Sequence, residues 1–184
     1  MVAAYLAFLS LFGAERAVEL WLSRRNARIA FARGGVESGA PHFRAMAAVH
    51  ALFLPACALE VLLLHRPFPG AWGFAAAGLA LLAQGLRWWA IAALRWRWNV
   101  RIIVVPGEPP VREGPYRFLR HPNYAAVATE MLCVPLAHGA WICAALFSAL
   151  NAALLSVRIR AEERALGRDW ERAFDGVPRF IPHG

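Results

Sequence analysis

The sequence contains no lysine and few charged residues of any kind. All twenty basic residues are arginine, and charged residues occupy only 17% of the 184 positions, whereas 59% are apolar. Soluble globular domains average about 25% charged and about 45–50% apolar residues. The composition therefore excludes an ordinary soluble domain, a disordered chain and a fibrous repeat, and it indicates a membrane protein.

Several familiar site patterns are also absent from the sequence. It has no Walker loop and no G-x-G-x-x-G, which excludes the usual soluble nucleotide-binding scaffolds. Its three cysteines, Cys57, Cys133 and Cys143, lie inside apolar runs, and no cysteine or histidine has metal-ligand spacing. The net charge of +8 would suit nucleic acid if it stood alone. Because the arginines cluster between apolar runs, we expect membrane lipids as partners, with no nucleic acid and no metal.

Five apolar runs are long enough, or nearly so, to cross a bilayer, which takes roughly 20 residues. They cover residues 2–22, 45–64, 71–94, 122–137 and 140–157. The first run contains Glu15, Arg16 and Glu19 and lacks a basic start, so we expect a retained helix and not a signal peptide. The last two runs are short and close together, so they either cross fully or form a re-entrant hairpin. The sequence predicts one all-α domain over residues 1–184, a polytopic bundle of about five transmembrane helices.

Arginine-rich and arginine-poor connections alternate along the chain. The segments 23–44, 95–121 and 158–184 are rich in arginine, whereas the segment 65–70 holds only Arg66 and the segment 138–139 holds none. Arginine-rich connections stay on the cytoplasmic side. We therefore expect the N-terminus outside and the C-terminal helix in the cytoplasm.

Two polar segments could carry chemistry. In residues 99–124 the prolines and glycines predict an ordered, turn-rich loop. Pro122 then begins a helix, which puts His121 and Asn123 at a helix N-terminus, a setting that favours a bound carboxylate or phosphate.

The second polar segment, residues 158–180, has helical periodicity. Ile159, Leu166, Trp170 and Phe174 form an apolar stripe typical of a helix that lies on the membrane or covers a pocket. Arg158 and Glu162 are one helical turn apart. From their spacing alone, a surface ion pair is the simpler expectation.

Two charged residues lie inside predicted spans, where ionisable groups are functional candidates. Arg87 and Glu130 are each roughly 10–12 Å deep from the same side at 1.5 Å per residue. We expect them to face each other or to line one cavity, although a purely structural ion pair fits equally well. His50 has no visible partner, and we expect it to be a packing or interface residue.

The two polar segments resemble the isoprenylcysteine carboxyl methyltransferase family of integral membrane methyltransferases. The resemblance covers residues 106–182 and rests on four motifs: Gly114-Pro115-Tyr116, Arg120-His121-Pro122-Asn123-Tyr124, Arg158 with Glu162-Glu163, and Val177-Pro178-Arg179-Phe180-Ile181-Pro182. Residues 23–46 look like the first cytoplasmic loop of a bacterial branch of that family. A bacterial member would lie in the inner membrane, with three N-terminal spans in residues 1–98 and the cofactor loop, hairpin and C-terminal helix in residues 99–184.

The resemblance implies S-adenosylmethionine as the methyl donor. Its contacts would be Tyr116, His121, Pro122, Asn123, Tyr124 and Glu162. The resemblance also gives Arg158 a catalytic and substrate-binding role, to which we add Arg87 beside the substrate and Glu130 as a further catalytic candidate. The loop before Tyr116 departs from the family pattern.

We expect methyl transfer to a carboxylate or phenol oxygen of a lipophilic or lipid-linked acceptor. A phospholipid N-methyltransferase is one alternative, and it would need a base, for which Glu130 is the plausible residue. An NADPH-dependent membrane reductase of related architecture is a second alternative. A non-catalytic scaffold whose arginines bind anionic lipid is a third.

Overall fold

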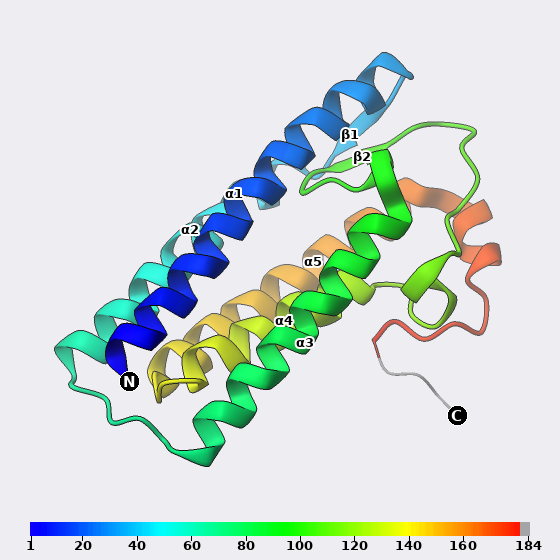
Figure 1. The fold of residues 1–184 in the computed structure, drawn as a ribbon. Coiled ribbons are helices and arrows are strands. Elements are labelled where there is room, and N and C mark those ends of the chain that lie inside the picture. Colours follow the sequence, from blue (N-terminus) through cyan, green and yellow to red (C-terminus); the bar gives the residue numbers. More distant parts are fainter. Residues whose placement is uncertain (181–184) are drawn as a thin grey trace.

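The computed structural model describes residues 1–180, apart from the side chains of residues 40–42. This part of the chain forms five α-helices: α1 (Val2–Ala32), α2 (Ala40–Leu63), α3 (Ala71–Leu94), α4 (Pro122–Leu136) and α5 (Trp141–Ala173). They lie lengthwise in an elongated bundle (Figure 1). The predicted all-α helical bundle is confirmed.

Short elements connect the helices at one end of the bundle, which we call the loop end (residues 33–39, 95–121 and 174–180). They are the strands β1 (Val36–Ser38) and β2 (Ile102–Val104) and the 3-10 turns η1 (Arg95–Arg97) and η2 (Gly114–Arg117). The N-terminus and the α2–α3 and α4–α5 connections lie at the opposite end (Figure 1). The loop end therefore collects the arginine-rich connections of the sequence.

Three of the helices among residues 1–180 are long and apolar enough to cross a membrane, namely Phe43–Leu63, Ala71–Arg97 and Trp141–Ala173. Their outward faces are apolar, and Trp72 and Leu82 are 81% and 72% exposed. The 15 residues of α4 span only about 22 Å, which is less than the roughly 30 Å of a hydrocarbon core. Helix α4 is therefore shorter than a full span, and it packs against the longer α5.

Helix α1 continues ten residues beyond the predicted span, from residue 22 to Ala32, so the prediction of a loop directly after residue 22 is wrong. Its polar side chains there have partners on the η1 turn and the residues after it. Ser23 Oγ donates to Asn99 Oδ1 at 2.9 Å, and Asn26 Nδ2 donates to the carbonyl of Trp98 at 2.8 Å. Because these groups are buried and satisfied, the helix can stay intact past its apolar part.

The two strands tie the first and third connections together. β1 and β2 pair antiparallel, with Val36 opposite Val104 and Ser38 opposite Ile102. Nothing in the residue pattern predicted this pair. The strand pair anchors the turn-rich loop, which begins near β2, to the C-terminal end of α1 and the N-terminal end of α2.

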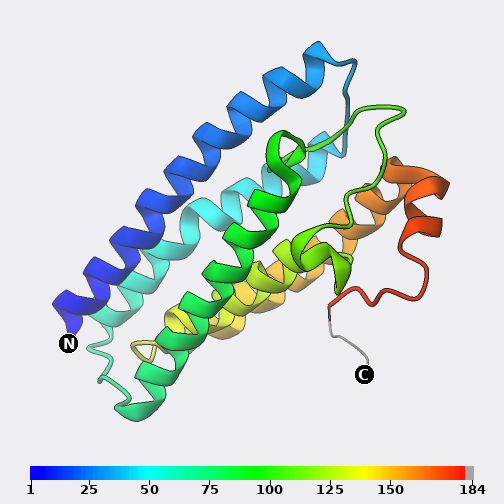
Figure 2. The same ribbon diagram turned by 45° about the vertical axis from the view of Figure 1, so that its right-hand side comes forward.

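The helices pack unequally. α4 packs between α3 and α5, and α2 packs against α5, whereas α1 lies at the edge of the bundle beside α2 (Figure 2). The apolar core gathers away from the loop end around Tyr5, Phe12, Phe53, Val134 and Phe147. The half of the bundle nearest the loop end is therefore free to hold a cavity.

Candidate active site

A cavity of about 1040 Å³ extends from the loop end into the bundle. Near the loop end its polar lining includes His121, Tyr124, Arg158 and Glu162, and deeper between the helices it includes Arg16, Glu19 and Arg87. Apolar side chains such as Leu20, Ala51 and Val127 line the remainder. One cavity thus joins a polar mouth to a charged floor among the helices.

The hydroxyl of Tyr124 connects α4 to α5 at the mouth of the cavity. It donates to Glu162 Oε2 and accepts from Arg158 Nε at 2.7 Å. Arg158 Nη2 donates to the carbonyl of Val100 at 2.7 Å, and the residue is only 4% exposed. The surface ion pair predicted from the spacing of Arg158 and Glu162 is therefore wrong: the arginine is buried and reaches Glu162 through the tyrosine.

The C-terminal segment closes one side of the mouth. His121 Nε2 lies 3.1 Å from Glu163 Oε1, and Arg179 holds both oxygens of Glu163, at 3.0 and 2.7 Å. The backbone N–H of Arg120 donates to the carbonyl of Pro178 at 2.9 Å. Arg120 Nε also donates to the carbonyl of Val177, which is 57 residues away in the sequence. The motif that begins at Arg120 and the motif that begins at Val177 are thus bound to each other.

Helix α5 breaks at Gly167, and its last part turns away from the line of the long helix (Figure 2). Trp170, on that last part, and Phe174 just after it line the cavity. Gly167 has φ 75° and ψ −172°, a conformation open essentially to glycine alone. Beyond it, Trp170 and Phe174 are buried against Tyr116, and the Trp170 ring lies 5.7 Å from that of His121. The helix predicted over residues 158–180 ends at Ala173, and its second half covers the pocket.

Tyr116 reaches the cavity because η2 approaches α3 closely. Gly114 has φ +57°, and a Cβ there would meet Trp89 Nε1 and the Cβ of Ala93 at 3.0 Å. Burial raises the pKa of the Tyr116 hydroxyl, and the carboxylate of Glu162 raises it further. Tyr116 therefore stays protonated and presents a neutral hydroxyl donor.

Asn123, at the start of α4, provides a buried acceptor. Its Oδ1 atom has no hydrogen-bond partner among the described residues, and the residue lines the cavity. A buried amide oxygen without a partner is costly. The Oδ1 atom of Asn123 is therefore suited to accept a hydrogen bond from an N–H or O–H group of a bound ligand.

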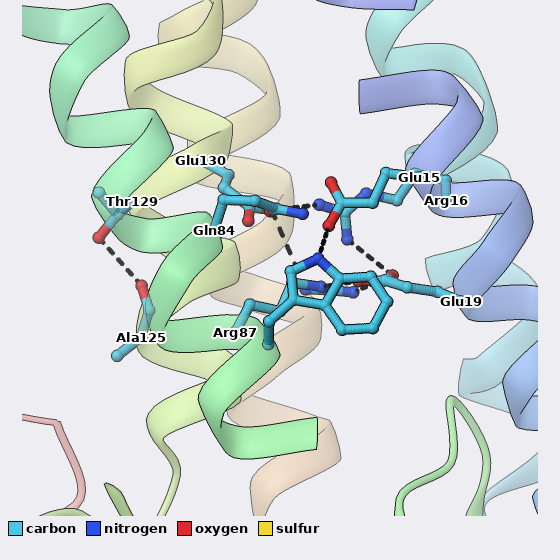
Figure 3. Close-up of polar contacts among 9 residues, drawn as sticks. Glu15, Arg16, Glu19, Gln84, Arg87, Ala125, Thr129 and Glu130 are labelled. Carbon is cyan, nitrogen blue, oxygen red and sulfur yellow. Dashed lines mark hydrogen bonds and ion pairs between the residues drawn. The ribbon is translucent and has the colours of Figure 1, made fainter. Parts of the chain in front are cut away.

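The floor of the cavity is formed by Arg16, Glu19 and Arg87, which contact one another and Glu130 behind them (Figure 3). Arg16 donates to Glu130 Oε2 at 2.7 Å and to Glu19 Oε2 at 2.9 Å. Arg87 donates to both oxygens of Glu19, with Nη2 at 2.6 Å from Oε2. Arg87 Nη1 lies 4.0 Å from Glu130 Oε2. The structure thus brings Arg87 and Glu130 together, but each has a closer partner on α1.

Arg16 and Glu19 were missed as site residues by the sequence reasoning, which used them only to exclude a signal peptide. Their separation of three residues places both on one face of a helix. That spacing inside an apolar run was the available signal for an inward-facing pair.

We expect the Glu19–Arg87 pair to carry much of the stability of this cluster. Glu19→Met alone leaves the buried Arg87 with a weaker partner, and breaking a buried pair costs about 3–5 kcal/mol. The double variant Glu19→Met/Arg87→Met should lose much less, because no charge is left unpaired. Thermal melting of the detergent-solubilised variants measures this coupling, with the partly exposed Glu37→Gln as control. Additive losses in the double variant would show that the two side chains are not coupled.

The family model described as "Isoprenylcysteine carboxyl methyltransferase (ICMT) family" matches residues 76–168, about half of the chain. The chain belongs to this family. The ICMT match runs from α3 through the Gly167 break of α5, so it includes Tyr116, Tyr124, Arg158 and Glu162. Of the closing motif, residues 177–180 lie beyond the match, and residues 181–182 lie outside the described residues.

Two bacterial proteins are similar to this ICMT-family chain over most of its length. The uncharacterized protein YpbQ of Bacillus subtilis is 41% identical over 152 residues, covering 83% of this chain and 90% of YpbQ. An uncharacterized protein of Haemophilus influenzae is 27% identical over 161 residues, covering 83% of this chain and 89% of that protein. Neither name states an activity. The ICMT family itself gives the reaction class, that of a membrane methyltransferase.

Proposed function

We propose that this protein transfers the methyl group of S-adenosylmethionine to an oxygen of a lipophilic acceptor at the cytoplasmic face of the membrane. The observation that carries the proposal is the single cavity that joins the residues of the donor motifs to a floor between the apolar helices. A polar donor can enter at the loop end, and an acceptor can reach the same space from the bilayer. The arginine-rich segments at the loop end support its cytoplasmic placement.

The lining fits the chemistry of this donor. S-adenosylmethionine, when bound, supplies an electrophilic methyl group on a positively charged sulfur. The carboxylate of Glu162 and the ring faces of Tyr124 and Trp170 suit a cation, the open Oδ1 of Asn123 suits an amino group, and the start of α4 suits a carboxylate. We assign donor binding to Tyr116, His121, Pro122, Asn123, Tyr124 and Glu162.

Arg158 is our candidate for holding the acceptor oxygen. Its Nε and Nη2 atoms are fixed by Tyr124 and Val100, and no described residue accepts a hydrogen bond from Nη1. The guanidinium stays charged at any physiological pH. It can therefore stabilise negative charge on an oxygen while the oxygen attacks the methyl carbon.

The floor charges are proposed to serve the acceptor side. Arg87 lines the cavity and is our candidate for contact with a polar part of the acceptor. Glu130, the further catalytic candidate, is held by Arg16 and is absent from the described lining, so we propose that it is a positioning residue that holds the two arginines in place. Glu130 is therefore not placed to act as the free base that the phospholipid N-methyltransferase alternative assigned to it.

Ligand-dependent melting separates this proposal from the reductase alternative. S-adenosylmethionine and its demethylated product, S-adenosylhomocysteine, should raise the melting temperature of the solubilised protein, because a ligand at 100 times its dissociation constant stabilises the folded state by about 2.7 kcal/mol. NADPH at the same concentration should cause no shift. A shift with NADPH alone would contradict the proposed function.

A further inference from the structure

His50 stands on the cavity side of α2, close to the polar mouth. Met46, one helical turn earlier, packs against Tyr124, Leu155 and Ile159. Residues four apart on a helix share a face, and His50 itself lines the cavity. The imidazole therefore lies one turn, about 6 Å, deeper than the contact between Met46 and Tyr124. The expectation that His50 is a packing or interface residue did not include this exposure to the cavity.

The hydrogen bonding of His50 defines which ring nitrogen carries the proton. Nδ1 lies 2.9 Å from the carbonyl oxygen of Met46. A carbonyl only accepts, so Nδ1 is the protonated nitrogen, and in the neutral ring Nε2 has a free lone pair. No described residue forms a hydrogen bond with Nε2. Nε2 is thus a basic nitrogen with a free lone pair, on a residue that lines the cavity.

The charges around His50 are mostly positive or already paired. Titratable and charged groups that line the same cavity from the neighbouring helices are Arg16 and Glu19 on α1, Arg87 on α3, His121 and Tyr124 at α4, and Arg158, Glu162 and Asp169 on α5. Glu19 is bound by the two floor arginines, and Glu162 accepts from Tyr124. The neutral form of the ring is the form that can take a proton at Nε2.

We propose that His50 is the general base for an acceptor that carries a weakly acidic, phenol-like hydroxyl, a proposal that rests on the proposed function. The hydroxyl proton passes to Nε2 as the oxygen, held by Arg158, bonds to the methyl carbon. The carbon–sulfur bond of the donor breaks, and its electron pair stays on the sulfur, which becomes a neutral thioether. His50 then releases the proton to water at the cavity mouth. A carboxylic acid, with a pKa near 4, is already ionised and needs no such base.

Two matched acceptors and two variants test this role. The probes are para-dodecylphenol and its ring-tetrafluorinated analogue, which is ionised at neutral pH. His50→Asn keeps an amide N–H near the position of Nδ1 to bond the Met46 carbonyl, and His50→Gln places an amide near Nε2; neither can take up a proton. The control is His65→Gln, an exposed histidine at the opposite end of the bundle.

The expected result is a selective loss. Both His50 variants should lower kcat/KM for para-dodecylphenol by about 10²- to 10⁴-fold, the range of general-base catalysis, and should change the value for the fluorinated analogue less than about fivefold. Affinity for S-adenosylhomocysteine, measured by calorimetry, should be unchanged. The His65→Gln control should match the unmodified protein with both acceptors.

Other outcomes overturn the proposal in distinguishable ways. An equal loss with both phenols, or no loss with either, would show that His50 does not act as a base. Unmodified protein that binds S-adenosylhomocysteine but methylates neither phenol would overturn the hydroxyl acceptor and leave the donor site standing. Protein that fails to bind S-adenosylhomocysteine would overturn the proposed function itself.

Discussion

Replacing Glu162 with glutamine will weaken the binding of S-adenosylmethionine about 10- to 150-fold, because a hydrogen bond to a charged group contributes about 1.5–3 kcal/mol. The substitution keeps the shape of the side chain and removes its charge. The Glu162 side chain is 28% exposed, and an amide oxygen can still accept from the Tyr124 hydroxyl. The fold should therefore survive, and the loss should report on the charge alone.

Titration calorimetry with two ligands makes the Glu162 experiment sharper. If Glu162 faces the sulfonium, the variant should lose more affinity for S-adenosylmethionine than for S-adenosylhomocysteine, whose sulfur is neutral. If it faces the amino group, both losses should be alike. Glu171→Gln, which changes an exposed carboxylate beyond the Gly167 break of α5, should bind both ligands normally. Undiminished affinity for both ligands in Glu162→Gln would contradict the assigned donor site.

Replacing Arg158 with alanine will leave donor affinity within a few-fold of normal and lower methyl transfer by at least about 10²- to 10³-fold, the usual effect of removing one group that stabilises transition-state charge. The guanidinium is fixed at two nitrogens and free at the third, so it acts on the acceptor oxygen and not on the donor. Arg158→Lys should recover only part of the rate, because an ammonium cannot hold Tyr124, Val100 and an oxygen in one planar geometry.

Arg160 offers a matched control for Arg158, since it is exposed two residues further along the same helix. Arg160→Ala should leave both donor affinity and rate unchanged. The rate is measured by transfer of a labelled methyl group to para-dodecylphenol, and donor affinity by calorimetry. Full turnover in Arg158→Ala would remove Arg158 from the reaction, whereas a loss of donor affinity would move it to the donor side of the cavity.

The apolar runs predicted the ends of a helix best where residues at that end of the helix themselves set the boundary. The run 71–94 coincides with α3 (Ala71–Leu94), and Pro122 begins α4 as its fixed φ favours. The end of α1 was predicted ten residues too early, because Ser23 and Asn26 look like loop residues until their partners around η1 are known. Those partners come from more than 60 residues away. No local pattern encodes them.

The candidate site was predictable in its residues and not in its contacts. The motifs named Tyr124, Arg158 and Glu162, but spacing along α5 says nothing of the tyrosine that α4 places between the other two. Glu19 was missed because its partner Arg87 lies on another helix. His50 was not predicted as a site residue because its relevant neighbours are a backbone carbonyl and a cavity, and neither can be recognised from a sequence pattern.

The most direct test of the central claim is transfer of a labelled methyl group from S-adenosylmethionine by the purified protein in vesicles made from the total membrane lipids of its native cell. We predict a labelled, organic-soluble product that forms with the unmodified protein and, at donor concentrations below the dissociation constant, forms about 10- to 150-fold more slowly with Glu162→Gln. If the unmodified protein bound S-adenosylmethionine yet released no labelled organic-soluble product above the Glu162→Gln level, methyl transfer to a lipophilic acceptor would be contradicted.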